Sequence, residues 1–126
     1  MRIGELADRA GVSLKALRYY EGLGLLEAER LPNGYRDYDE TDVRLVEEIR
    51  QLTALGIRVE DTRPFVECLV AGHDNGDDCL ASVEAYRDAI ATLDAQAREL
   101  AVRRVRLAEL LARAEERAGC GCEVGA

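Results

Sequence analysis

The sequence predicts a mainly α-helical protein in which an N-terminal winged helix-turn-helix domain precedes one long C-terminal helix. Two short helical segments, separated by a glycine-containing turn, begin the chain. An Asn33-Gly34 pair follows and favours a tight hairpin, since both residue types tolerate positive φ. Further on comes a long stretch without Gly or Pro, rich in the helix formers Ala, Leu, Arg and Glu. We therefore expect a winged helix-turn-helix domain with a second-wing helix at residues 1–72, a linker loop at residues 73–78, a long helix at residues 79–118 and a C-terminal loop or tail at residues 119–126.

Size and composition limit the possible functions. A chain of 126 residues supports one core plus an appendage, so a large catalytic fold and an enzyme function are disfavoured. No apolar run reaches the roughly 18 to 20 residues of a membrane span, and the N-terminus does not resemble a secretory signal. We therefore expect a cytoplasmic protein without a membrane partner. Taken alone, the net charge of -8 argues against nucleic acid as a partner. However, no acidic residue lies between Arg9 and Tyr20, so a local basic patch remains there.

The second of the two short helices is expected to have a packed side and an exposed side. Ser13 is placed to cap its first turn. The helical period puts Lys15, Arg18 and Tyr19 on one side, with apolar residues opposite. Two cations and a phenol within one turn suit phosphates and base edges in a DNA major groove. From this helix alone, an ordinary solvated helix face remains an equal alternative.

The hairpin that follows is a candidate wing. Arg36 and Tyr38 alternate with a period of two, so we expect both on one face of its second strand, within reach of a phosphate backbone. The alternative is a structural hairpin with polar groups that face solvent.

Two further helical segments are expected before the linker. The first begins in the acid-rich residues 39–42 and ends at Gly56. The second lies within residues 59–70 and must start near Thr62, because Pro64 is tolerated only in the first turn. His73, the only histidine, stands in the loop near the next cysteine, where it is either a metal ligand or a solvated side chain.

The long helix carries an apolar stripe. Alternating steps of four and three residues select side chains that are apolar except for one arginine: Cys79, Val83, Tyr86, Ile90, Leu93, Ala97, Leu100, Arg104, Leu107, Leu111, Ala114 and Ala118. A sustained repeat of this kind is typical of a coiled coil, and its simplest partner is a second copy in a two-fold homodimer. If the two helices run antiparallel, Cys79 of one subunit approaches Cys120 and Cys122 of the other.

Four segments of the N-terminal half together closely resemble the MerR family of bacterial regulators. They are Ile3 to Ala7, Gly11 to Ser13, Leu17 to Glu21 with Gly24 to Leu26, and Asn33 to Tyr38. The resemblance implies a homodimer held by an antiparallel coiled coil, which binds a pseudo-palindromic promoter operator and distorts the double-stranded DNA for RNA polymerase. It also implies DNA contacts by five residues: Lys15, Arg18, Tyr19, Arg36 and Tyr38.

The resemblance also suggests an effector. Family members that sense divalent metals carry a cysteine just before the dimer helix, as Cys79 stands here, and Cys120-Gly121-Cys122 falls near their C-terminal metal-binding loop. Thiolates suit zinc or heavier thiophilic ions such as mercury, cadmium and lead. The sequence therefore predicts a metal-responsive regulator with Cys79, Cys120 and Cys122 as ligands. The interval between Cys79 and Cys120 is closer to that in the family's iron–sulfur redox sensors, but the loop here has two cysteines instead of four.

Other functions remain open from the sequence. The same thiols could respond to oxidation or to electrophiles. The effector could also be an organic ligand, or the protein could bend DNA without any effector. From a different class, a small thiol oxidoreductase or metal carrier could use Cys-Gly-Cys, although this would leave the winged helix and the dimer seam without purpose.

Overall fold

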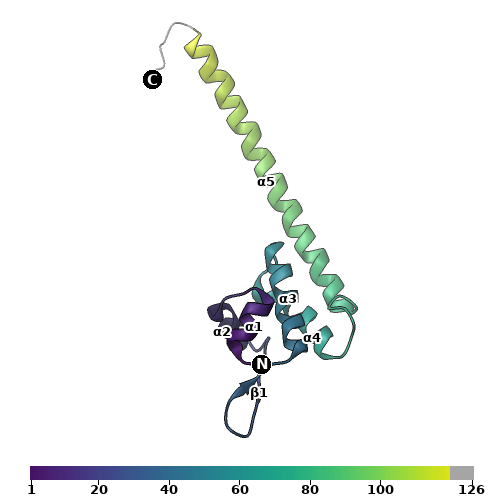
Figure 1. Cartoon of the computed structure of the whole chain (residues 1–126). Helices are drawn as coiled ribbons and strands as arrows, with labels where there is room; N and C mark the ends of the chain where they lie inside the picture. The colour runs from purple at the N-terminus through teal and green to yellow at the C-terminus, as the bar shows by residue number, and fades with distance from the viewer. Residues whose placement is uncertain (120–126) are drawn as a thin grey trace. The chain divides into compact units, whose positions relative to one another are not determined.

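The computed structural model describes residues 1–119 and confirms the mainly α-helical architecture (Figure 1). Its elements are, in chain order, α1 (Ile3–Ala10), α2 (Leu14–Gly22), β1 (Glu29–Arg30), β2 (Arg36–Asp37), α3 (Glu40–Ala54), the 3-10 helix η1 (Val59–Thr62), α4 (Arg63–Val70) and α5 (Leu80–Ala118). The chain forms two compact units, of which the first comprises Met1–Ala89 and the second begins at Ile90. None of the helices in residues 1–119 combines the length and the apolar character that crossing a bilayer requires.

Local capping explains where the helices of the first unit begin and end. Gly11, in the left-handed region with φ 71°, ends α1 and donates its N–H to the Ala7 carbonyl at 2.9 Å. Ser13 caps α2 by accepting the Ala16 N–H at 3.0 Å, as predicted. Asp39 forms a reciprocal capping box with Asp42 at the start of α3.

Pro64 lies in the first turn of α4, where its missing N–H would have no helical partner in any case. The turn before it is the short 3-10 helix η1, which ends at Thr62. This confirms the prediction that the helix had to start near Thr62.

The first unit has two hydrophobic clusters. The larger one joins α1, α2, α3 and α4 through apolar side chains that include Leu6, Leu17, Leu26, Tyr38, Val46 and Ile49. The smaller one joins α3 and α4 to the beginning of α5, where the rings of Phe65 and Tyr86 lie 5.0 Å apart. The unit therefore includes α5 as far as Ala89, and its boundary lies beyond the loop at residues 73–78 where the sequence places it.

The candidate wing is a two-stranded antiparallel hairpin in which Arg30 pairs with Arg36 (Figure 1). Gly34 has φ 85°, and the Leu31 N–H donates to the Tyr35 carbonyl at 2.8 Å. The turn thus spans five residues, with positive φ at Gly34 but not at Asn33.

The structure contradicts the expectation that Tyr38 shares an exposed face with Arg36. Strand β2 ends at Asp37, and the Tyr38 N–H donates to the Met1 carbonyl at 2.8 Å. The Tyr38 side chain is only 2% exposed and belongs to the larger hydrophobic cluster. The alternation of strand residues therefore stops one residue too early to bring Tyr38 to the surface.

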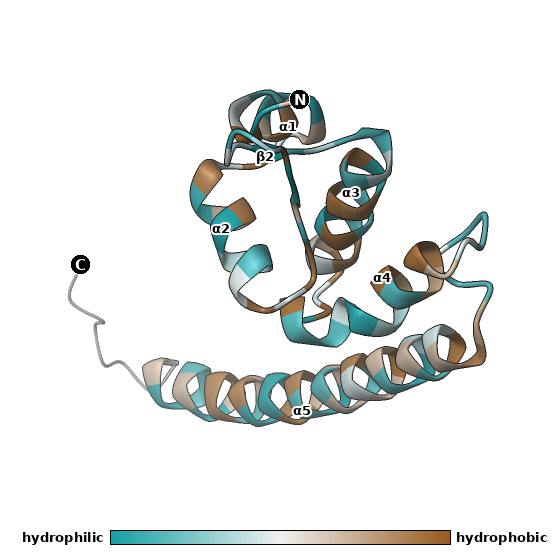
Figure 2. Cartoon of the chain, turned by 90° about the horizontal axis from the view of Figure 1, so that it is seen from below, coloured by the Kyte–Doolittle hydropathy of each residue, from teal (hydrophilic) through white to brown (hydrophobic). Residues whose placement is uncertain are grey.

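Within the second unit, α5 continues without interruption to Ala118. Figure 2 shows apolar and polar residues alternating around this helix. Large apolar side chains of the predicted stripe are each more than half exposed in the single chain: Ile90, Leu93, Leu100, Leu107 and Leu111.

Candidate DNA-binding face and cysteine cluster

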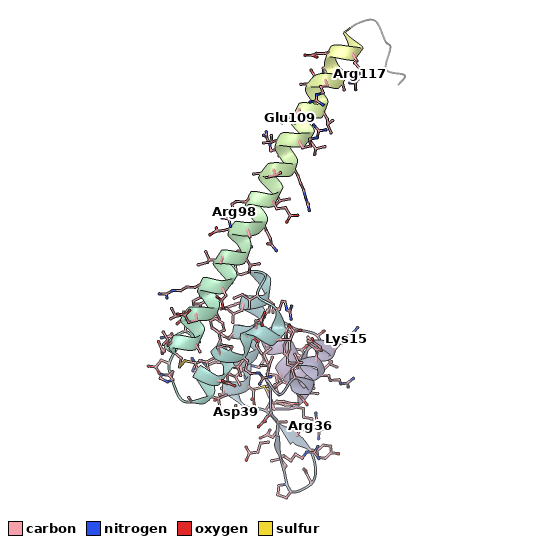
Figure 3. All side chains as sticks on the ribbon, turned by 180° about the vertical axis from the view of Figure 1, so that it is seen from behind. Lys15, Arg36, Asp39, Arg98, Glu109 and Arg117 are labelled. Carbon is pink, nitrogen blue, oxygen red and sulfur yellow. A yellow bond between two sulfur atoms is a disulfide. The ribbon has the colours of Figure 1, made fainter. Side chains whose placement is uncertain are left out.

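Helix α2 has the two sides that its sequence predicts. Leu17 and Tyr20 are buried against the core and fix the rotation of the helix. Lys15, Arg18 and Tyr19 are exposed on the opposite side. Within residues 1–119, neither Lys15 nor Arg18 forms an ion pair or a side-chain hydrogen bond. Figure 3 shows Lys15 projecting outward from the unit. Both cations are therefore available to a phosphate.

The Tyr19 hydroxyl is oriented by a neighbouring carboxylate. It donates to Glu60 Oε1 of η1 at 3.2 Å, and this hydrogen bond raises the pKa of Tyr19. Arg58 lies 3.5 Å from the other oxygen of Glu60. The phenol at the edge of the exposed side of α2 is thus held in place before any ligand arrives.

Glu21 connects α2 to the hairpin. One of its carboxylate oxygens pairs with the Arg36 guanidinium, and the other accepts the Tyr38 hydroxyl. Burial, and then the hydrogen bond to Glu21, raise the pKa of Tyr38 to about 12. Arg36, half exposed near the base of the hairpin (Figure 3), is therefore positioned relative to α2. No sequence pattern singled out Glu21, because its role depends on a contact 15 to 17 residues away.

Two other arginines of this unit are already engaged. Arg9 forms a bidentate ion pair with Glu40, which raises the pKa of Arg9 and leaves little free charge there. The Arg2 guanidinium stacks over the ring of Tyr35 in the hairpin, 4.5 Å from its centroid. Because Arg9 is engaged, the free positive charge in the acid-free stretch from Arg9 to Tyr20 comes from Lys15 and Arg18 of α2.

A second cluster joins the end of α4 to the start of α5. The ligand atoms of Cys68, His73 and Cys79 all lie within 4.8 Å of one another. Cys68 is 2% exposed, His73 is exposed and Cys79 is intermediate. The two cysteines are joined as a disulfide, with their Cα atoms 6.0 Å apart. A thiol pair and an imidazole can bind a thiophilic ion or cycle between dithiol and disulfide.

The C-terminal cap of α4 explains how His73 reaches this cluster. Gly72 adopts φ 98° and donates its N–H to the Leu69 carbonyl at 3.0 Å. The His73 N–H then donates to the Cys68 carbonyl at 3.3 Å. This pair of bonds is a Schellman motif, which turns the chain back over the last turn of the helix. A residue placed directly after Gly72 is thereby brought close to Cys68.

The rest of the loop is tied to the neighbouring helices. The buried Ser82 hydroxyl of α5 donates to the Gly76 carbonyl at 2.6 Å, and the Tyr86 hydroxyl donates to Asp77 at 3.0 Å. From α3, Arg44 donates to the Asp74 carbonyl at 2.6 Å. The backbone carbonyl of Cys79, which lies directly before α5, accepts the Val83 N–H at 3.3 Å. The position of Cys79 is therefore fixed by the fold of the first unit.

The structure groups Cys79 with Cys68, which the sequence did not assign to a site, and with His73, which the sequence left open as a metal ligand or a solvated side chain. The predicted partners Cys120 and Cys122 lie outside the described residues. Within the described residues, Cys79 forms its cluster with Cys68 and His73. The sequence contained one usable indication, the Gly-His step after a helix that ends near Cys68.

Comparison with known proteins shows which family the N-terminal half of the chain matches. The model of the MerR HTH family regulatory protein matches residues 1–67, more than half of the chain. The chain belongs to the MerR family. The HTH-type transcriptional regulator HmrR of Rhizobium leguminosarum bv. viciae is 38% identical over 101 residues, which are 79% of this chain and 75% of that protein.

Two further proteins are similar to part or all of the chain. The mercuric resistance operon regulatory protein of Bacillus cereus is 44% identical over 61 residues, which are 48% of this chain and 46% of that protein. The structure of the transcription regulator PbrR691 from Ralstonia metallidurans CH34 in complex with lead(II) matches with a TM-score of 0.62 and 27% identity, and covers 100% of this chain and 91% of that chain. The chain is thus a DNA-binding transcriptional regulator of the MerR family and not an enzyme.

Proposed function

We propose that this MerR-family regulator acts as a homodimer on a pseudo-palindromic promoter operator and that a thiophilic divalent metal ion controls its effect on RNA polymerase. The observation that carries the proposal is the anchored helix α2, which presents Lys15, Arg18 and Tyr19 outward without charged partners on the two cations. A helix presented in this way suits the major groove. The exposed apolar stripe of α5 supports a second copy as the dimer partner, since a single chain leaves it uncovered.

The proposed DNA contacts are Lys15, Arg18 and Tyr19 from α2 and Arg36 from the wing. Glu21 would fix the spacing between these two groups through its ion pair with Arg36. Tyr38 is left out because its side chain is buried. Phosphate contacts by Lys15 and Arg36 would set the register, and Arg18 would reach base edges or phosphates.

Replacing Arg18 by alanine tests this DNA-binding surface. We expect R18A to bind operator DNA more weakly, and the slope of log affinity against log salt concentration to fall in magnitude by about one, as for one lost phosphate contact. R113A is the matched control, since Arg113 is an exposed arginine of α5. Fluorescence anisotropy over a salt series measures both quantities. Equal affinity and slope for R18A and R113A would refute the assignment.

The proposed effector is a divalent ion such as zinc, mercury, cadmium or lead, with Cys79, Cys120 and Cys122 as candidate ligands. The fixed position of Cys79 directly before α5 supports this, because an ion bound there lies at the start of the helix proposed for dimerisation. The donor set around Cys79, two sulfurs and an imidazole, also fits such ions. The similar regulator PbrR691 was crystallised with lead(II).

Transcription in vitro tests the effector. With the reduced full chain, RNA polymerase and an operator promoter, we expect one or more of these four ions to change transcript yield at near-stoichiometric metal. The C79S variant should still bind the operator but should not respond. If no ion of the panel changes transcription, the metal part of the proposal fails.

A second candidate effector is an oxidant, and the disulfide between Cys68 and Cys79 favours it. Cysteine pairs that form a disulfide inside cells are usually transient and often sense redox state. In the same assay, a hydroperoxide would then change transcription in the absence of added metal, and a dithiol would reverse the change.

A further inference from the structure

We propose that Cys68, His73 and Cys79 of one subunit form a three-ligand site for a single zinc-like divalent ion, without ligands from Cys120, Cys122 or a second chain. The inference replaces Cys120 and Cys122, the candidate ligands named above beside Cys79, by Cys68 and His73, and only its consequence for transcription rests on the proposed function. The binding site itself depends on the geometry of the first unit alone.

The donor atoms are of the right kind and nearly at the right spacing. Tetrahedral zinc has Zn–S distances of about 2.3 Å and Zn–N distances of about 2.0 to 2.1 Å, which places its ligand atoms roughly 3.5 to 3.8 Å apart. All three donor atoms here already lie within 4.8 Å of one another. Small side-chain rotations, with no change of backbone, can therefore bring them around one ion. The fourth position would be left to water.

The backbone of the site is built before any ion binds. The Schellman motif at Gly72 fixes His73 over Cys68 through the 3.3 Å bond between the His73 N–H and the Cys68 carbonyl. The buried bond from Ser82 to Gly76 holds the loop against α5, next to Cys79. Since these bonds close the loop from both sides, an ion does not have to order the chain in order to bind.

The electrostatic surroundings also favour a cation. Exposed carboxylates stand beside the three donors in the same loop, at Asp74, Asp77 and Asp78. Their negative field attracts a divalent ion. The loop thus supplies an attraction for the ion, and the two sulfurs and the imidazole supply its ligands.

The disulfide and the metal complex exclude one another, because both use the same two sulfur atoms. A dithiol reductant transfers two electrons and two protons to the disulfide, which gives two thiols and the oxidised, cyclic reductant. The divalent ion then displaces the two thiol protons and binds the two thiolates. Metal binding should therefore require prior reduction and should release protons.

Cobalt(II) serves as the probe, because its thiolate charge-transfer and visible bands report the ligands and the coordination number. The reduced full chain and its C120S/C122S variant are titrated after the reductant has been removed. We expect both to bind one cobalt ion per subunit with thiolate bands, and with affinities within about tenfold of each other. A sample oxidised to the disulfide should show no thiolate band. Loss of the band in C120S/C122S would overturn the proposal.

Variants of the new ligands complete the test. H73Q changes an exposed residue and should leave folding intact. It should lower the cobalt affinity by at least about tenfold, because even the loss of a group that only supports a metal ligand typically lowers metal affinity by about tenfold or more. E27Q changes an exposed residue outside this loop and is the control. C68S should lose at least as much affinity, and circular dichroism checks that this buried change still allows folding. Unchanged affinity in H73Q would overturn the proposal, even if C68S fails to fold.

The promoter assay separates this inference from the proposed function. If C120S/C122S binds cobalt in the predicted way but no variant responds to metal in transcription, the site stands and the proposed effector fails. If H73Q responds to metal like the parent chain while C120S/C122S does not respond, the proposed function stands and the site at Cys68, His73 and Cys79 fails.

Discussion

Tyr38 shows how one hydroxyl can serve the core and the wing together. Its ring packs among apolar residues, while its hydroxyl donates to the same Glu21 that holds Arg36. A buried phenol that donates to a carboxylate resists ionisation, which agrees with its pKa of about 12. The neutral form of Tyr38 is therefore part of what keeps the wing attached to α2.

The stability of the chain should depend on this proton at alkaline pH. The folded state holds the Tyr38 proton more tightly than the unfolded chain, so the stabilisation is complete below about pH 10 and is lost as the pH rises through about 12. Urea unfolding at several alkaline pH values should show this decline. In Y38F the decline should be smaller by up to about 1.4 kcal/mol per pH unit. A residual decline is expected in Y38F, because the pKa of Tyr86 is also raised to about 12. If the free energy of unfolding falls equally steeply with pH in Y38F and in the parent chain, the argument is wrong.

The sequence predicts which side chains are exposed well where only the phase of one helix matters. Lys15, Arg18 and Tyr19 were assigned to the exposed side of α2 by the 3.6-residue period, and they lie there. The role of Glu21 could not be predicted, since it requires that the hairpin folds back onto α2. Tyr38 was misplaced because two-residue alternation holds only as long as the strand continues, and β2 ends at Asp37.

At the scale of whole elements, the loop between α4 and α5 is more than a linker. The Ser82 hydroxyl is fully buried and donates to the Gly76 carbonyl. A Cβ added at Gly76 would lie 2.7 Å from a Glu48 carboxylate oxygen and 3.3 Å from the Phe65 carbonyl oxygen, so the loop leaves no room for a side chain there. The loop is therefore a packed part of the first unit. This also explains why the compact unit continues into α5 instead of ending before it.

Removing the Ser82 hydroxyl should weaken the unit measurably. S82A leaves the Gly76 carbonyl without this donor in a buried position, so we expect the free energy of unfolding to fall by about 1 to 3 kcal/mol. T41A is a suitable control, because Thr41 is exposed in the first turn of α3, and its effect should stay within about 0.5 kcal/mol. Chemical denaturation monitored by circular dichroism measures both variants. A similar loss in both would mean that the buried hydrogen bond contributes nothing specific.

Element boundaries were predictable where capping chemistry is local. Ser13 at the start of α2 and Pro64 in the first turn of α4 each follow from the chemistry of one residue. The limit of the first unit was not predictable in this way. It depends on Phe65 and Tyr86 meeting across 21 positions of sequence, a contact that no helical period reveals.

At the scale of the whole molecule, the 39-residue helix α5 carries most of the large apolar side chains that the single chain leaves exposed. A helix of this length extends roughly 58 Å. A 3.5-residue repeat predicts its apolar stripe, and the large apolar side chains of that stripe are exposed from Ile90 to Leu111. The single chain thus supports association through α5, in agreement with the proposed homodimer.

A charge in the stripe should separate the subunits. L93R places a guanidinium twice in a two-fold interface, where burial of each leucine contributes about 1.5 to 3 kcal/mol, so the dimer dissociation constant should rise by at least about a hundredfold. A95R adds the same charge to an exposed position of α5 outside the stripe and is the control. Analytical ultracentrifugation gives the two constants. A dimer that tolerates L93R as well as A95R would show that this stripe is not the interface.

The glycine turn at the end of α4 makes the cysteine cluster recognisable in unrelated sequences. Because Gly72 alone folds His73 back over Cys68, and a closed loop returns the chain at Cys79, all three donors fall within twelve consecutive residues. The spacing Cys-x3-Gly-His-x5-Cys is therefore a linear fingerprint. Any regulator that carries it between two helices can be selected for metal-binding assays before its fold has been determined.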